Sequence, residues 1–208
     1  MPPSAPSVID LAEIAPAFSD PTRESQAVFR KIMDAVARPG TIHDLALAPD
    51  APQGLDRAAG AVALTLLDFE TPVWLDPALR NGAAESWLRF HCGCPLTEDP
   101  NGAAFALVTD ALAAPELSAF NPGDAKYPDR STTLIVQLPS LAGGPLVTLK
   151  GPGIKDQASL ALAGLPTGFW DQVRTNQAKF QFGVDLVFVA GDRLTALPRS
   201  TRVTDQGN

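Results

Sequence analysis

Short apolar runs alternate with segments of helical periodicity along most of this chain. The runs, each bounded by turn residues as buried strands are, cover residues 71–75, 105–108, 132–138 and 184–189. The helical segments cover residues 21–37, 55–67, 84–90 and 168–179. Because such interleaving packs helices against a sheet, we predict an α/β layered domain with a mixed β-sheet. Residues 1–18, rich in proline and alanine, are expected to form a flexible arm, which leaves 19–208 as a single domain.

The first helix has recognisable ends. Asp20 is an N-cap candidate, and Pro21 takes the first helical position. Apolar side chains then recur at helical spacing at Val28, Phe29, Ile32, Met33 and Val36. The helix should end at Arg38, since the residue before a proline avoids the α region. At that end Arg38 has a structural role available, because its charge complements the helix dipole.

Charge and composition exclude several classes of protein. The net charge is −7 and no Lys/Arg run occurs, which argues against binding nucleic acid. No apolar run approaches the ~18 residues of a membrane span, and the first residues lack the pattern of an export signal. The two cysteines cannot build a disulfide framework. We therefore expect a cytoplasmic protein that binds neither membrane nor nucleic acid.

No metal site or catalytic constellation is predicted. His91-Cys92-Gly93-Cys94 invites a metal interpretation, but structural zinc needs four ligands and His43 is the only other histidine. We therefore predict that this segment is a helix end followed by a turn with buried thiols. Two histidines do not assemble a Ser-His-Asp set, and no phosphate-binding P-loop or dinucleotide fingerprint is present. The catalytic residues, if the chain has any, stay unknown from the sequence.

A Gly-Pro-Gly turn follows the apolar run 146–149. Gly151 and Gly153 permit backbone angles closed to other residues, and Lys150 and Lys155 stand on either side of them. Bare backbone amides and two ammonium groups stabilise negative charge, so the turn could receive an anion. Glycine and proline also make ordinary turns, and that alternative stays open.

Asp185 and Arg199 belong to the closing strands of the chain, 184–189 and 194–198, which read as a hairpin. Asp185 enters an apolar strand, where a carboxylate is costly unless it is paired. It either remains in solvent or bonds to Arg199, to Arg202 or to the Gly-Pro-Gly turn. Guanidinium groups suit phosphate and carboxylate geometry, although a segment such as 199–202 is more commonly a solvated tail.

The ordered set of motifs resembles one family. These motifs are FRKIMDAVARPGTI (29–42), LTLLDFETPVWL (64–75), WLRFHCGCP (87–95), LKGPGI (149–154) and FGVDLVFVAGDRLTALPR (182–199). Together they resemble PhnH, the H subunit of the bacterial carbon–phosphorus lyase system for phosphonate catabolism. The resemblance spans nearly the whole chain apart from the N-terminal arm.

The resemblance implies a partner set and a reaction. Family members form a core complex with the G, I and J subunits, with I as the chief partner, and form homodimers alone. With G, I and L they act where ATP loses adenine and its ribose triphosphate is joined to a phosphonate. The implied fold is similar to the large domain of pyridoxal-phosphate-dependent transferases, without the cofactor; no cofactor and no metal are expected.

The sequence thus favours a non-autonomous subunit of a transferase complex, not catalytic alone. Its site is expected at the turn, with substrate-binding candidates at Lys150, Gly151, Gly153, Lys155, Asp185 and Arg199. Another subunit would complete that site. Two alternatives remain: a stand-alone phosphonate- or nucleotide-binding protein, and a purely structural assembly subunit.

Overall fold

A computed structural model of the protein describes residues 14–205 and shows four α-helices in that range. The helices are α1 (Pro21–Ala37), α2 (Arg57–Leu66), α3 (Ala83–Cys92) and α4 (Phe169–Ala178). Each matches a helix predicted from the sequence, with ends that differ by at most two residues. None of the helices in the described part of the chain is long and apolar enough to cross a membrane.

A seven-stranded mixed sheet forms the centre of the molecule. Its strands are β1 (His43–Asp44), β2 (Val73–Leu75), β3 (Leu96–Thr97), β4 (Phe105–Val108), β5 (Thr133–Gln137), β8 (Asp185–Ala190) and β9 (Arg193–Leu197). They are ordered β1-β9-β8-β5-β4-β2-β3, and β9 alone among them runs antiparallel to the other strands. The predicted α/β class, mixed sheet and closing hairpin β8–β9 are confirmed.

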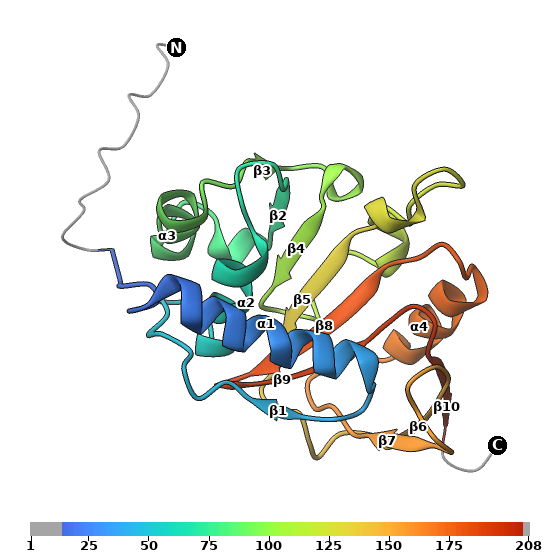
Figure 1. Ribbon diagram of the computed structural model, residues 1–208. Coiled ribbons are helices and arrows are strands. Elements are labelled where there is room, and N and C mark those ends of the chain that lie inside the picture. Colours follow the sequence, from blue (N-terminus) through green and yellow to red (C-terminus); the bar gives the residue numbers. More distant parts are fainter. Residues whose placement is uncertain (1–13, 206–208) are drawn as a thin grey trace.

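Both faces of this sheet are covered, so each side has its own hydrophobic core. Helices α1, α2 and α3 pack on one face, with Val28, Val62 and Trp87 almost fully buried there (Figure 1). Helix α4 covers part of the other face through Phe169 and Val173. A three-layer arrangement follows, in which the parallel strands are buried on both sides, as their continuous apolar sequences require.

A second, three-stranded sheet lies beside α4 (Figure 1). Its strands are β6 (Val147–Lys150), β7 (Ala158–Leu160) and β10 (Arg202–Asp205), ordered β10-β6-β7 and antiparallel throughout. Val203 is buried against the core. Asp205 forms an ion pair with Arg174 of α4, with 3.3 Å between Asp205 Oδ1 and Arg174 Nη1. The reading of residues 199–202 as a solvated tail is therefore wrong, because this segment leads into β10.

Helix α1 begins as predicted but buries less than its apolar pattern suggests. The Asp20 carboxylate accepts a hydrogen bond from the Arg23 amide, and the helix ends before Arg38. Val28, Ile32 and Ala35 are buried, whereas three other apolar side chains remain exposed: Phe29, Met33 and Val36. The apolar stripe is thus wider than the face that meets the sheet.

The first thirteen residues of the expected arm, 1–13, lie outside the described residues. Residues 14–18 lead into α1 and contact α3. The carbonyl oxygen of Ala15 accepts a 2.8 Å hydrogen bond from the Trp87 indole and lies 3.0 Å from His91 Nε2. Phe18 is buried in the same core, so the segment just before α1 is packed.

Candidate functional site

The Gly-Pro-Gly turn connects three segments of the fold at the end of β6. Gly151 has φ of 148°, and a Cβ there would lie 3.1 Å from the carbonyl oxygen of Ser200. Gly153 has φ of 79°, and a Cβ there would lie 1.8 Å from the carbonyl oxygen of Ala37, the last residue of α1. Both glycines are therefore needed for close backbone packing as well as for the turn.

Asp185 is paired, which decides between the two alternatives for this carboxylate. Its Oδ1 accepts a 2.8 Å hydrogen bond from the Arg199 amide, and its Oδ2 lies 2.8 Å from Arg199 Nη2. Arg199 Nη1 also donates to the carbonyl oxygens of Pro128 and Gly183, both at 2.9 Å. The Arg199 guanidinium thus holds the hairpin to two neighbouring loops.

A surface hollow of about 330 Å³ opens beside the turn. It is lined by Lys150, Gly151, Pro152, Gln177, Phe180, Ser200 and Arg202. Lys150 lies directly opposite Arg202 in the β6–β10 ladder, and both side chains are exposed. No carboxylate lines the hollow, and within residues 14–205 neither cation has an ion-pair partner. Its local charge is therefore positive in a chain of net charge −7.

The structure brings together some of the predicted site residues and separates the others. Lys150 and Gly151 line the hollow, whereas Gly153 contacts α1, and Lys155 is exposed beyond the turn. Asp185 and Arg199 also lie outside the lining and bond to each other. The sequence suggested Arg199 as the arginine beside the turn, but the arginine that lines the hollow is Arg202. Its position there follows from the pairing register of β10 with β6.

Gln177, Phe180 and Ser200 are lining residues that the sequence did not single out. They come from the end of α4, from the segment after it and from the link between β9 and β10. Phe180 carried one available signal, since it is a large apolar side chain just past a helix end, and it is 57% exposed. The signal is weak, because single exposed apolar residues are common.

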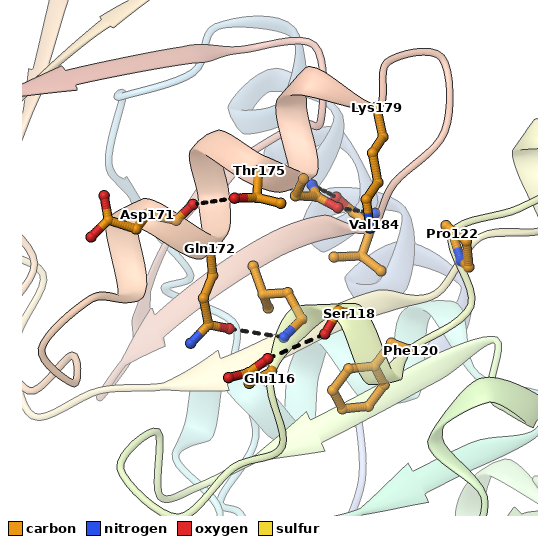
Figure 2. Close-up of a pocket in the computed structure, with 11 residues that line it drawn as sticks. Glu116, Ser118, Phe120, Pro122, Asp171, Gln172, Thr175, Lys179 and Val184 are labelled. Atoms are coloured by element: carbon orange, nitrogen blue, oxygen red, sulfur yellow. Dashed lines mark hydrogen bonds between the residues drawn. The ribbon is translucent and has the colours of Figure 1, made fainter.

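A second hollow, of about 220 Å³, lies between α4 and the 3₁₀ turn Leu117–Ala119. Figure 2 shows Gln172 reaching from α4 toward this turn, where its side-chain oxygen accepts the Leu117 amide at 2.9 Å. Glu116 and Asp171 line the hollow together with Lys179. Two carboxylates outweigh one ammonium group, so this hollow suits an anion less well than the one beside the turn.

The carboxyl ends of β2 and β4 belong to the sheet edge where α/β folds usually bind ligands, and a buried side chain of the protein occupies them. Asp76 follows β2 and is 3% exposed. Its Oδ1 accepts a hydrogen bond from the Ala78 amide, and its Oδ2 accepts hydrogen bonds from the amides of Thr109 and Asp110, which follow β4. These amides, which would otherwise be free to bind an anion, are thus satisfied by a buried carboxylate.

The cysteine segment is a helix end and a turn, as predicted. Helix α3 ends at Cys92, and Gly93 follows with φ of 64°. Burial raises the pKa of Cys92 to about 12 and also raises the pKa of Cys94. Across residues 14–205 no group of three or more His, Cys, Asp or Glu side chains is placed to hold a metal ion.

Comparison with known proteins identifies the family. The model of the bacterial phosphonate metabolism protein family (PhnH) matches residues 16–204. The chain belongs to the PhnH family. The resemblance drawn from the sequence motifs is thus confirmed, and the match extends past them into β10.

Two relatives of this PhnH-family chain are informative. A protein of Rhizobium meliloti (strain 1021) is 45% identical over 187 residues, which are 90% of this chain and 94% of the relative. It is described as the PhnH subunit of α-D-ribose 1-methylphosphonate 5-triphosphate synthase. A putative C–P lyase subunit, HtxG of Stutzerimonas stutzeri, is 29% identical over 88% of this chain and 87% of its own length.

Proposed function

We propose that this protein is a subunit of the synthase that joins the ribose triphosphate of ATP to a phosphonate, with loss of adenine. The observation that carries the proposal is the 45% identity, over nearly the full length of both chains, to the Rhizobium meliloti synthase subunit. In this role it acts with the G, I and L proteins in phosphonate catabolism. Since ATP is a cytoplasmic metabolite, we assign the step to the cytoplasm.

We infer that the chain is not catalytic alone. The strongest candidate groups already have structural partners: Asp76 accepts three amides, and Arg199 is bonded to Asp185 and two carbonyls. In our proposal Lys150 and Gly151 contact the substrate at the hollow beside the turn. Gly153 and the pair Asp185–Arg199 then hold the backbone around it, with Lys155 adding positive charge at its outer side. Another subunit completes this site, chiefly the I protein.

We also infer that residues 19–208 act as one PhnH-like domain whose fold is related to the large domain of pyridoxal-phosphate-dependent transferases, without their cofactor. The mixed seven-stranded sheet with helices on both faces supports this relation. The core complex would include the G, I and J subunits, and a homodimer would form when they are absent.

A purely structural assembly role is the second candidate, and one observation favours it. Phe29, Met33 and Val36 are 38–50% exposed along one stripe of α1. Exposed apolar side chains that share a helix face suit contact with another subunit. This role predicts that changes in the hollow leave the reaction intact as long as the complex assembles.

Deletion of the gene from its host bacterium tests the proposed function. Growth on methylphosphonate as sole phosphorus source should stop, while growth on phosphate should continue unchanged. A plasmid copy of the wild-type gene should restore growth. Unchanged growth of the deletion strain on methylphosphonate would contradict the proposal. A plasmid copy carrying Arg202→Glu separates the two roles, since an assembly subunit would restore growth equally well with either copy.

A further inference from the structure

The positive charge beside the Gly-Pro-Gly turn is arranged in an unusual way. Lys150 and Arg202 are directly opposite each other in an antiparallel ladder. Side chains at such positions lie roughly 5 Å apart at Cβ, and like charges there destabilise the sheet. Within the described residues no carboxylate forms an ion pair with either side chain, although the chain has 23 acidic against 16 basic residues. A bound anion would remove this repulsion.

Polar and aromatic groups complete the surroundings of the two cations. Ser200 and Gln177, which carry a hydroxyl and a side-chain amide, line the same hollow, as does the exposed Phe180. At the end of α4, the carbonyl oxygens of Asn176 and Gln177 accept hydrogen bonds from the amides of Lys179 and Phe180, which satisfies two of the carbonyls of the last turn. The volume of about 330 Å³ falls at the lower end of ordinary ligand sites, roughly 300–1,000 Å³.

We propose that this hollow binds the phosphate chain of a nucleoside triphosphate, with the base against Phe180. The Arg202 guanidinium forms a bidentate hydrogen-bonded pair with two oxygens of one phosphate, and the Lys150 ammonium forms an ion pair with an oxygen of the next phosphate. Ser200 and Gln177 donate to the remaining oxygens. Two cations side by side fit a chain of several phosphates better than a single phosphonate, and an exposed aromatic ring suits stacking on a base.

This inference rests on the proposed function in one respect, which is that the reaction uses a triphosphate. The relative's description names a 5-triphosphate product, so a substrate with that group must be bound somewhere in the complex. The proposal assigns that group to Lys150 and Arg202 of this subunit. The phosphonate is then left to a different part of the composite site.

Calorimetry on the full chain tests the assignment at about 0.15 M salt, where interactions between exposed charges more than ~8 Å apart are largely screened. ATP and inorganic tripolyphosphate should bind at or below about 1 mM and raise the melting temperature, and methylphosphonate should bind at least tenfold more weakly. Arg202→Ala should weaken ATP and tripolyphosphate at least tenfold. Phe180→Ala should weaken ATP only. Arg193→Ala, an exposed arginine on β9 away from the hollow, should leave both unchanged.

Arg202→Glu provides a control for folding. A carboxylate opposite Lys150 should form a cross-strand ion pair, so the ligand-free melting temperature should hold or rise while binding of ATP is lost. The assignment would be overturned by no heat with ATP at 1 mM, or by equal ATP binding in wild type and Arg202→Glu. If the chain supports growth on methylphosphonate but fails these binding tests, the site assignment is wrong and the proposed function stands. If the chain binds ATP as expected but is dispensable for growth on methylphosphonate, the proposed function is wrong and the site assignment stands.

Discussion

Arg199 joins three segments through the guanidinium group of a side chain that is only 16% exposed. Replacing it with alanine leaves the carbonyls of Pro128 and Gly183 and the Asp185 carboxylate without this donor. We expect Arg199→Ala to lower the free energy of unfolding by about 2–3 kcal/mol. Urea denaturation measures the change, with the exposed Arg193→Ala as the matched control. A loss no larger than that of the control would show that these bonds are not needed for stability.

The thiols of Cys92 and Cys94 should be unreactive in the folded protein. Burial favours the neutral thiol, and the pKa of Cys92 rises from 9.0 to about 12, so almost no thiolate exists at pH 8. A colourimetric thiol reagent at pH 8 should therefore titrate both thiols only after unfolding. The raised pKa also means that this thiol destabilises the fold as the pH rises from about 9 toward 12. Rapid modification of either cysteine in native protein would contradict this account.

At single positions, the sequence named the alternatives without deciding between them. A carboxylate entering an apolar strand had to be paired or exposed, and Asp185 is paired. Of the two arginines after the final predicted strand, Arg199 is paired with Asp185, whereas Arg202 lies opposite Lys150 and has no ion-pair partner within residues 14–205. Which arginine faces the turn depends on the register of β10, and that register is set by long-range pairing.

At the level of elements, the Gly-Pro-Gly turn fixes the end of α1 against β6. A Cβ on Gly153 would meet the Ala37 carbonyl oxygen, whereas Gly143 has a similar φ of 88° with nothing within 4 Å of the added atom. Gly153→Ala should therefore destabilise the protein by well over the ~1–2 kcal/mol that a left-handed backbone alone costs, and Gly143→Ala by about that amount. Thermal denaturation of the two variants compares them. Equal melting temperatures would contradict the close packing.

Elements with strong local signals were predicted, and elements defined by distant pairing were not. Asp20-Pro21 and Arg38-Pro39 mark the ends of α1 closely. Strand β10 carries only one buried residue, Val203, between exposed neighbours, so it lacks an apolar run. It becomes a strand because β6 offers it a free edge some fifty residues back in the chain. For the same reason the hollow between them was not visible in the sequence.

For the whole molecule, two cores on opposite faces of the sheet make a fold that can be stable by itself. The function we propose nonetheless requires other subunits of the complex. Asp76 satisfies the backbone at the carboxyl ends of β2 and β4, and the positively charged hollow beside the turn has exposed side chains at Arg202 and Phe180. The exposed apolar stripe on α1 gives a further reason to expect a partner. A site on such a surface gains enclosure only when another subunit covers it.

Reconstitution of the reaction from purified subunits tests the central claim most directly. With ATP, methylphosphonate and the G, I and L proteins, adding this chain should give adenine and ribose 1-methylphosphonate 5-triphosphate, detected by phosphorus NMR. The mixture without this chain, and this chain alone, should give no such product. Full product formation by the mixture that lacks this chain, or by this chain alone, would contradict the claim that it is a required but non-autonomous subunit.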